Sequence, residues 1–268
     1  MKKYLELLKY ELKNTWRDKM NAFMVIFPFF VLLLTVLLYP ALMNRVGADI
    51  SGMSIATIVI IIVMLGFGYV GAAALLGFSL LDNKDEDTLQ TIAVTPIGKR
   101  GYVKFKVIYT YIFAVISTII VLWGTKILAG DSYVVQIGAE TIKLFDNINF
   151  LEVLVFAISS SLFVPSVGLF IVGLSKNKIE GFAYMKSTGF LMLIPMLILL
   201  DTFKGLGQYL LSLFPNFWSV QGIISEMLPQ MFASSYNLNF YLYMLIGGVI
   251  CLAYSVLAYK IYMRKENN

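Results

Sequence analysis

The sequence predicts an all-α polytopic membrane protein with six transmembrane helices. Hydrophobic residues make up 59% of the 268 residues and charged residues only 14%, whereas soluble domains carry about 25% charged residues. The apolar residues form runs near the length of about 20 residues that a helix needs to cross a bilayer. A membrane β-barrel would instead show alternating segments of about 10 residues. We therefore expect residues 1–268 to form a single transmembrane domain.

Six apolar runs are the predicted spans. Their expected bounds are 22–43, 54–81, 105–129, 151–174, 181–201 and 239–263. The second run contains Gly66, Gly68 and Gly71, followed by alanines at 72–74, and such small side chains let a neighbouring helix approach closely. The alternative for this run is a flexible or merely lipid-facing span. The first run is longer than the core of a signal peptide and has no cleavage signal, so we expect it to be retained.

Residues 1–20 predict an amphipathic elbow helix before the first span. Apolar residues recur there at spacings near three and four: Tyr4, Leu5, Leu8, Leu12 and Trp16. Such a helix is expected to lie in the membrane interface until the chain turns inward at Arg17 and Asp18. The alternative is an ordinary solvated helix.

Residues 202–237 are too apolar for a free loop, yet glycines and prolines, including Pro215, interrupt them. We expect an outer hairpin of short amphipathic or re-entrant helices before the last span. Phe217 and Trp218 are expected at the level of the lipid headgroups, where aromatic residues are enriched.

The distribution of Lys and Arg predicts the orientation. Of the 21 Lys and Arg residues, 17 lie in the two terminal segments, in the connections after spans two and four, or near the adjoining span ends; only Arg45, Lys126, Lys143 and Lys204 remain for the other side. Cytoplasmic segments carry the excess of Lys and Arg, so both termini are predicted to be cytoplasmic. The same bias explains the basic pI, because these cations meet anionic inner-leaflet lipid; nucleic acid is not an expected partner.

The predicted spans offer little for catalysis or ion coupling. No Asp, Glu, Lys or Arg lies well inside a span, although a proton-coupled carrier normally uses such a group. The chain has no His and one Cys, Cys251, so no zinc site of the usual kind is expected. The most polar cluster within a span is Ser159, Ser160 and Ser161. We expect its hydroxyls to bond neighbouring helices, with substrate contact as the alternative.

The segment DEDTLQTIAVTPIGKR, residues 85–100, predicts a short cytoplasmic helix between spans two and three. Asp87 and Gln90 have the spacing of a capping box, and Pro96 disfavours helical geometry at Thr95. Thr95 and Pro96 are then expected to cap and begin the following helix. The expected apolar face consists of Leu89, Ile92 and Ala93. The alternative is a solvated loop that happens to be capped.

The run EDTLQTIAVTPIGKRGYVKFK resembles the cytoplasmic loop of type-2 ABC export permeases (ABC-2 type transporter transmembrane subunits). Those proteins carry a Gly-Thr-Leu-Glu-like helix, a Thr-Pro stop and a Lys about ten residues later. The matching residues are Thr88, Leu89, Ile92, Thr95, Pro96 and Lys106. Asp87 and Gln90 stand where Gly and Glu are commoner, and Phe105 where Gly often precedes the Lys. The elbow ending in WRDKMNAF, the six spans and an outer hairpin carrying FPNFWSVQGI extend the resemblance to the whole chain.

The resemblance implies one half of an ATP-driven exporter in a bacterial cell membrane. Two permease chains, identical or related, would sit on two cytoplasmic ATPase subunits that hold ATP and Mg, so this chain would be no enzyme and would carry no cofactor or metal. The residues implied for ATPase coupling are Glu86, Asp87, Thr88, Leu89, Gln90, Ile92, Thr95 and Pro96; those of the elbow are Trp16, Arg17 and Asp18, and those of the outer hairpin are Pro215 and Trp218. The coupling loop would cover residues 82–104.

Spans one, two and five would line the cargo path by the same resemblance. An apolar and aromatic lining favours an amphipathic cargo, such as a drug, a peptide or a lipid-like molecule. The substrate-contacting residues are not assigned. Two other functions stay open at this point: an ion-coupled secondary transporter, and a membrane sensor or immunity protein that transports nothing.

Overall fold

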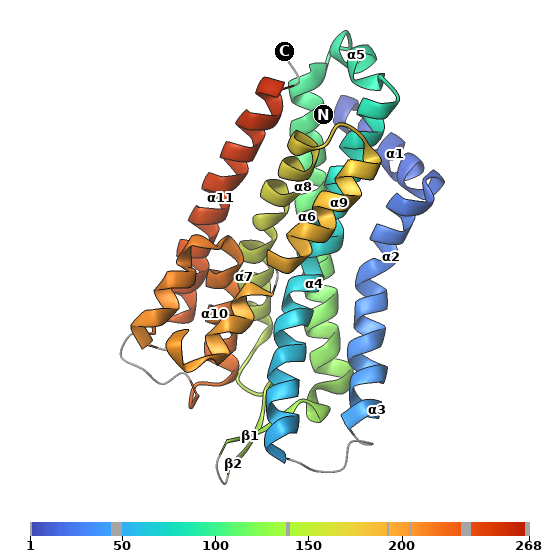
Figure 1. Ribbon diagram of the computed structural model, residues 1–268. Coiled ribbons are helices and arrows are strands. Elements are labelled where there is room, and N and C mark those ends of the chain that lie inside the picture. Colours follow the sequence, from blue (N-terminus) through green and yellow to red (C-terminus); the bar gives the residue numbers. More distant parts are fainter. Residues whose placement is uncertain are drawn as a thin grey trace.

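The computed structural model describes residues 2–43, 50–137, 140–191, 193–203, 205–231 and 237–265. Long helices run side by side along one axis, and both termini lie at the same end (Figure 1). Arg45 and Lys204, used above for the orientation, lie outside the described residues. An even number of spans requires the termini to share a side; that this side is cytoplasmic stays a prediction.

Helical segments long and apolar enough to cross a membrane number six among the described residues, which confirms the predicted fold class. Their bounds are Lys19–Met43, Ser54–Asp85, Gly98–Ser132, Phe150–Leu174, Lys178–Leu199 and Phe240–Lys265. The predicted runs agree within a few residues except where polar residues extend a helix beyond its apolar part. The third helix shows this most clearly, because it begins at Gly98 and not at 105.

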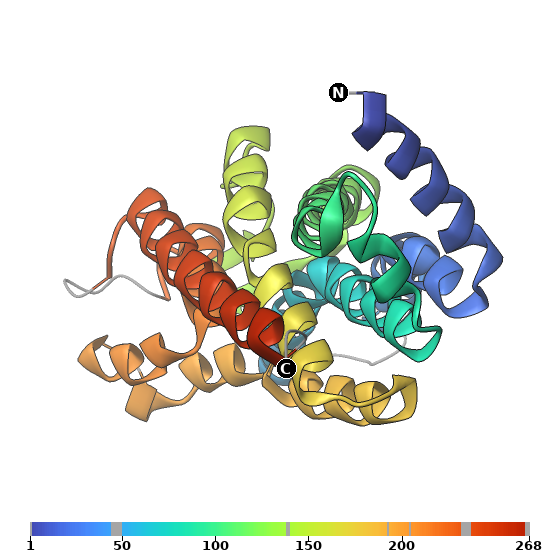
Figure 2. The ribbon, with the colours of Figure 1, turned by 90° about the horizontal axis from the view of Figure 1, so that it is seen from above.

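The elbow and the first span are separate helices. α1 (Lys2–Arg17) lies across the direction of the bundle, as Figure 2 shows, and α2 (Lys19–Leu33) turns along it. Asp18 makes the turn because its side chain accepts a hydrogen bond from the Asn21 backbone N–H at 2.8 Å, the capping contact that helix N-termini favour. A π-helical turn, Leu34–Leu38, and α3 (Tyr39–Met43) complete the span.

α4 (Ile50–Asp85) is the central helix, and its small residues explain why. A Cβ added at Gly71 would lie 2.9 Å from the ring of Phe27 on α2, and one at Gly68 would lie 3.2 Å from Thr118 on α6 (Gly98–Ala129). The alanines at 72–74 are buried. The small-residue stretch is thus a packing surface, as predicted, and the lipid-facing alternative is wrong.

The fourth span is broken in its middle. α7 (Phe150–Ser161) and α8 (Phe163–Leu174) meet at Leu162, because Pro165 has no N–H to continue the helical ladder toward Ser161. Ser159 Oγ donates to the Met244 carbonyl oxygen of α11 (Phe240–Lys265) at 2.7 Å. The prediction of a helix-to-helix hydrogen bond is therefore confirmed for Ser159. Ser160 and Ser161 are buried without such a partner among the described residues.

The fifth span is an α-helix for only part of its length. α9 (Lys178–Leu191) is followed by 3-10 segments at Ile194–Leu199, Asp201–Phe203 and Gly205–Leu213. Pro195 explains the change, because its ring clashes with the carbonyl four residues earlier and cannot donate to it. At 1.5 Å per residue, α9 covers only about 21 Å.

The outer hairpin forms short helices, but its aromatic residues face inward. α10 (Pro215–Met227) packs against α7 and α11. Phe217 and Trp218 are 0% and 7% exposed, and the Trp218 indole N–H donates to the Ser212 carbonyl oxygen at 3.0 Å. Both rings are therefore packed against the bundle and not on its surface, and their level in the membrane stays a prediction. Residues 232–236 of the predicted hairpin lie outside the described residues.

A β-hairpin at the end opposite the termini was not predicted. Strands β1 (Val134–Ile137) and β2 (Glu140–Lys143) pair antiparallel, with Val134 opposite Lys143. Tyr133, just before β1, stacks on Tyr39 with ring centroids 4.1 Å apart and donates to the Thr35 carbonyl oxygen at 2.8 Å. These aromatic and hydroxyl contacts hold the outer end of the first span to the loop after α6.

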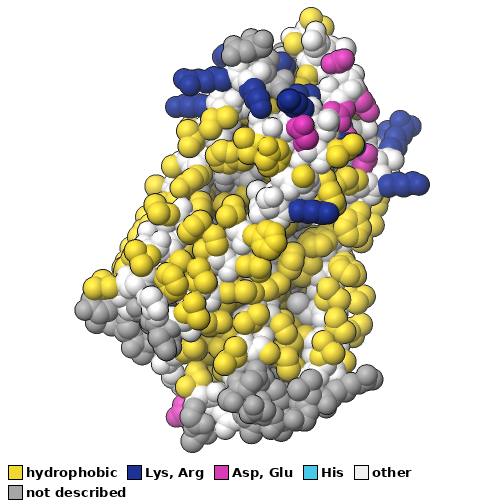
Figure 3. Space-filling model, viewed as in Figure 1, with side chains coloured by type: hydrophobic (Ala, Val, Ile, Leu, Met, Phe, Trp, Pro, Cys, Tyr) yellow, Lys and Arg dark blue, Asp and Glu magenta, His cyan; other side chains and the backbone are white. Residues whose placement is uncertain are grey.

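The surface divides into an apolar body and a charged end. Hydrophobic side chains cover the middle of the face in Figure 3, and Lys, Arg, Asp and Glu gather at the end where the termini lie. Two core clusters fill the interior, one around Phe156 and Tyr243 toward the outer end and one around Leu76 and Tyr262 toward the terminal end. This arrangement suits a bilayer around the body, with the charged end in water.

Gly168 of α8 tests the close packing around α4. A Cβ there would lie 2.8 Å from Leu76 Cδ2, whereas one at Gly189 of α9 meets nothing within 4 Å. We expect Gly168→Val to cost about 1–3 kcal/mol of folding stability through overpacking. Thermal unfolding of the purified chain measures this cost. Gly189→Val is the matched control, and an equal loss in both variants would contradict the packing argument.

Candidate functional site: the cleft between the elbow helix and the α4–α6 connection

The connection between α4 and α6 is shorter than the predicted loop 82–104. α4 continues to Asp85, α5 (Thr88–Ala93) follows, and α6 begins at Gly98. The predicted short helix therefore exists, and it ends before Thr95 and Pro96 as expected. It stands beyond the ends of the long helices, at the same end as both termini (Figure 1).

The predicted caps of this segment do not form. Asp87 has φ +52°, in the left-handed region, and its side chain makes no capping hydrogen bond, so Asp87 and Gln90 form no capping box. Thr95 Oγ1 donates back to the Ile92 carbonyl oxygen at 2.7 Å and does not cap α6. The left-handed backbone favours glycine and tolerates Asp, which explains how Asp87 occupies a position where the resembling permeases commonly have Gly.

α5 has one face toward the bundle and one toward solvent. Leu89 is 4% exposed and belongs to the core cluster of the terminal end, and Ile92 packs against the same cluster. Gln90, Ala93 and Val94 lie on the outside, with Val94 86% exposed. Leu89 therefore anchors α5 to its own chain, and the residues available to a partner are those around Val94.

A cleft of about 620 Å³ separates α1 from this connection. Its residues come from three parts of the chain: Glu6, Leu7, Tyr10, Asn14 and Asp18 at the elbow, Asp82, Asn83 and Glu86 at the end of α4, and Thr88, Thr91, Ile92, Thr95, Pro96, Ile97 and Tyr102 beyond it. We call this the elbow cleft. It brings the predicted coupling residues Glu86, Thr88, Ile92, Thr95 and Pro96 together with Asp18 of the predicted elbow set.

A buried hydrogen-bonded chain forms the floor of the elbow cleft. Lys106 Nζ and Glu11 Oε2 are 2.6 Å apart, with side-chain exposures of 1% and 3%. Tyr102 donates its hydroxyl proton to Glu11 Oε1 at 2.9 Å and accepts from Asn83 Nδ2 at 2.8 Å. Thr88 Oγ1 then donates to Asn83 Oδ1 at 3.1 Å. The chain of contacts links α1, α6, α4 and α5 in that order.

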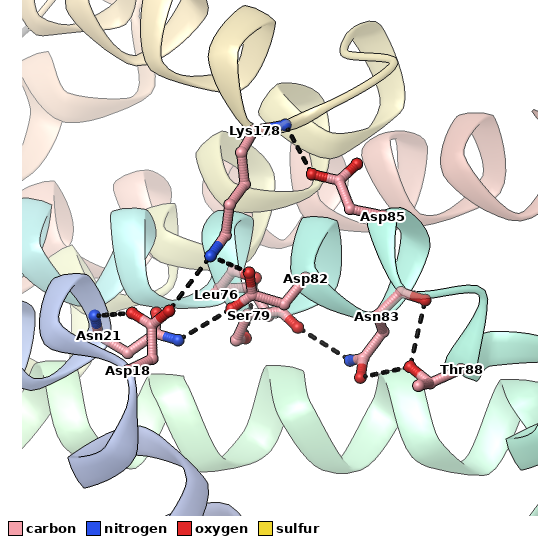
Figure 4. Close-up of polar contacts among 9 residues, drawn as sticks. All are labelled: Asp18, Asn21, Leu76, Ser79, Asp82, Asn83, Asp85, Thr88 and Lys178. Atoms are coloured by element: carbon pink, nitrogen blue, oxygen red, sulfur yellow. Dashed lines mark hydrogen bonds and ion pairs between the residues drawn. The ribbon is translucent and has the colours of Figure 1, made fainter.

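A second polar network joins the elbow turn to α9, as Figure 4 shows. Lys178 Nζ pairs with Asp82 and lies 3.2 Å from Asp18 Oδ2, while Asn21 Nδ2 donates to Asp82 Oδ2 at 3.0 Å. The Lys178 backbone N–H donates to Asp85 Oδ2 at 3.1 Å. The last turn of α4 thus holds both the start of α2 and the start of α9.

The Asp18 carboxylate is stabilised in its charged form. Partial burial alone would raise its pKa, but the hydrogen bond from the Asn21 backbone and the Lys178 ammonium group hold the pKa below its ordinary value. The group therefore stays ionised at neutral pH, and the contact with Lys178 persists. This contact connects the elbow turn to the fifth span.

Some predicted site residues lie away from the elbow cleft. Trp16 and Arg17 are exposed on α1 outside it, and Pro215 and Trp218 belong to α10, far from α5 in Figure 1. Their predicted roles stay predictions. The sequence reasoning missed the partners of Lys106 and Lys178, since each pair joins segments that are distant in sequence.

No catalytic centre is visible in the parts of the chain that the structure describes. No three acidic, His or Cys side chains come together there in a way that could hold a metal ion. Cys251 is buried in α11. The polar contacts of the site join the ends of several helices and leave one side of α5 exposed.

Comparison with known proteins places the chain in a transport family. Residues 11–259 match the family model described as "Fluoroquinolones export permease protein Rv2686c-like". The match covers most of the chain, so the protein belongs to this family of export permeases. It is thus a transmembrane protein of an efflux family. Comparison with curated proteins found no match.

The Glu11–Lys106 pair gives a test of the buried chain. Removing one member of a buried ion pair leaves an uncompensated charge, which costs about 3–5 kcal/mol. We expect Lys106→Met to lower the thermal unfolding temperature of the purified chain strongly. Adding Glu11→Gln removes the orphaned charge and keeps an acceptor for Tyr102, so the double variant should recover most of the loss. A double variant with an unfolding temperature as low as that of Lys106→Met, or lower, would contradict the pairing.

Proposed function

We propose that this chain is the membrane-spanning subunit of an ATP-driven exporter of the ABC-2 type. Separate cytoplasmic ATPase subunits would bind at α5 and the elbow cleft, and a second permease copy would complete the transport unit. The observation that carries the proposal is α5 itself. It is a separate short helix beyond the bundle, anchored by Leu89 and exposed at Val94.

The contacts behind α5 support its role in receiving force. Thr88 bonds both the carbonyl oxygen and the side chain of Asn83, at 3.2 and 3.1 Å. Asn83 leads through Tyr102 to the ion pair of Glu11 and Lys106. A displacement of α5 would therefore move α4, α6 and the elbow together. Such coupled rigid-body motion is the usual basis of switching between two packed states.

Charge and shape support the elbow cleft as part of the docking site. It lies between two exposed segments of the terminal end, and its rim carries the carboxylates of Glu6 and Glu86. Both are exposed, so a basic or polar protrusion of a partner subunit would find acceptors there. ATP and Mg would remain on that subunit.

The fifth span supports a second permease copy. In its most apolar window only 12% of residues are buried, compared with 72% for the second span. Large apolar side chains are exposed on it, including Phe190 at 73% and Phe182 at 42%. Facing spans from two copies would enclose an apolar path, which suits an amphipathic cargo. The family description suggests fluoroquinolones as the first candidates.

Substitution on the outer face of α5 tests ATPase coupling. Ala93→Asp with Val94→Asp places two charges on the exposed side without touching Leu89. We expect ATP-driven fluoroquinolone transport by the permease and its ATPase to fall at least about tenfold, the size of effect seen at interface hot spots. Transport is measured as uptake into inverted membrane vesicles, in which the export direction points inward, with ion gradients collapsed.

Leu174→Asp is the control, because Leu174 is 49% exposed at the end of α8, outside both the α4–α6 connection and the proposed dimer surface of α9. Equal loss in this control would contradict a specific role for α5. Flux driven by an ion gradient without ATP would instead establish a secondary transporter. Absence of flux under every condition would favour the non-transporting alternative.

Cysteine cross-linking tests the second copy. We expect Phe190→Cys to give a disulfide-linked dimer in membranes treated with a mild oxidant, because two fifth spans would face each other. Val249→Cys on α11, at 60% exposed, should stay monomeric. The native Cys251 is buried and does not interfere. Equal cross-linking at both positions would contradict the proposed interface.

A further inference from the structure

An apolar groove lies on the surface between α6, α8 and α11. Its volume is about 430 Å³, and its walls carry Ile108, Tyr111, Leu169, Leu252 and Val256. Ile108 and Val256 are 58% and 53% exposed, so the groove opens outward from the bundle. The break between α7 and α8 contributes Leu162 and Pro165 to the same surface.

One end of this groove continues into a basic hollow. The hollow measures about 420 Å³ and is lined by Arg100 and Lys104 of α6 and by Lys260 and Arg264 of α11. Lys104 and Lys260 line both the groove and the hollow. On each helix the two cations are four residues apart, which places them on one face. The four cations therefore gather at the end of the groove where the termini lie.

The cations of the hollow have no acidic partner in the described part of the chain. Neither the groove nor the hollow is lined by Asp or Glu. Elsewhere at the same end, buried or half-buried lysines are paired: Lys106 with Glu11, and Lys178 with Asp18 and Asp82. Four clustered positive charges repel one another, so the hollow favours an anion from outside the chain.

Tyr259 connects the two surfaces. It lines both the groove and the basic hollow. The groove and the hollow therefore share a wall, so one ligand can extend from the apolar part to the cations.

We propose that the groove between α6, α8 and α11 holds one anionic phospholipid, with its phosphate among Arg100, Lys104, Lys260 and Arg264 and an acyl chain along Ile108 and Val256. Basic pockets between transmembrane helices on the cytoplasmic side have the chemistry that binds anionic headgroups. The apolar groove supplies the site for the tail, so both halves of the ligand are matched.

A second copy of the chain fits this surface less well than a lipid. In a two-fold symmetric interface each surface meets its own equivalent, so the four cations would face four more. The proposed dimer surface on α9 has no such cluster. The lipid site also does not depend on the proposed transport function, because it would exist in any protein with this surface.

Native mass spectrometry of the full-length chain in detergent tests the headgroup part. Phosphatidylglycerol and phosphatidylcholine with the same acyl chains are titrated separately. We expect one phosphatidylglycerol to bind preferentially, and Lys104→Gln with Lys260→Gln to weaken it about 30-fold, since each basic residue near the surface contributes roughly 1 kcal/mol and tenfold is about 1.4 kcal/mol. Lys9→Gln with Lys13→Gln on α1 removes the same charge from exposed positions outside the groove and should change binding less than twofold.

The tail part is tested with the groove blocked. Val256→Trp fills the groove, whereas Leu257→Trp changes a neighbouring position that is similarly exposed but does not line it. We expect only Val256→Trp to reduce phosphatidylglycerol binding, by at least about tenfold. Glycerol phosphate, which lacks tails, should not displace the lipid even at concentrations at which phosphatidylglycerol saturates the site.

Three outcomes would overturn the proposal. The first is equal binding of phosphatidylcholine, which would show that the cations do not select the headgroup. The second is equal weakening in the two charge variants, which would show general attraction to the basic end. The third is competition by glycerol phosphate or indifference to Val256→Trp, which would show an anion site without a lipid groove.

Discussion

The buried ion pair between Glu11 and Lys106 is the constraint on which the terminal end of the protein depends. Two charges this far from water are tolerated only when they are paired and further hydrogen-bonded, and Tyr102 supplies that additional bond. The pair fixes which face of α1 turns inward. The polar face with Glu11 packs on α6, and the apolar stripe with Leu5 and Trp16 is left exposed. An amphipathic helix oriented in this way presents its apolar side to a membrane surface.

The same constraint belongs to a continuous set of contacts that joins several segments. The elbow is tied to α6 by the ion pair, α6 to α4 by Tyr102 and Asn83, and α4 to α5 by Thr88. Lys178 adds the start of α9. If the energy for transport comes from another subunit, the spans must be coupled to that subunit outside the membrane. The polar contacts between helices described above lie at the charged end, whereas apolar packing around α4 holds the body together.

The apolar surfaces of the bundle are not equivalent. The exposed face of α9 carries Phe182 and Phe190 with a single cation, Lys186, over the Phe182 ring, whereas the groove beside α11 ends in four cations. Hydropathy alone treats both as lipid-facing. The two surfaces differ in charge: the groove ends in a cluster of four cations and the face of α9 does not. We therefore propose a lipid site at the groove and a protein interface at α9.

The sequence by itself determined the six spans, their approximate ends and the short helix between the second and third. These are local properties: apolar length decides whether a helix crosses the bilayer, and Pro96 disfavours helical geometry at the residue before it. The sequence did not determine the capping of α5 or the inward position of Leu89 and Trp218, whereas the end of α9 follows from Pro195, which is a local cause. Tertiary structure decided the capping and the inward positions, because the left-handed backbone at Asp87 and the burial of an aromatic ring depend on neighbouring helices. The pairing of Glu11 with Lys106 is the clearest case, since a charge on an amphipathic helix looks solvated until the partner that desolvates it is in place.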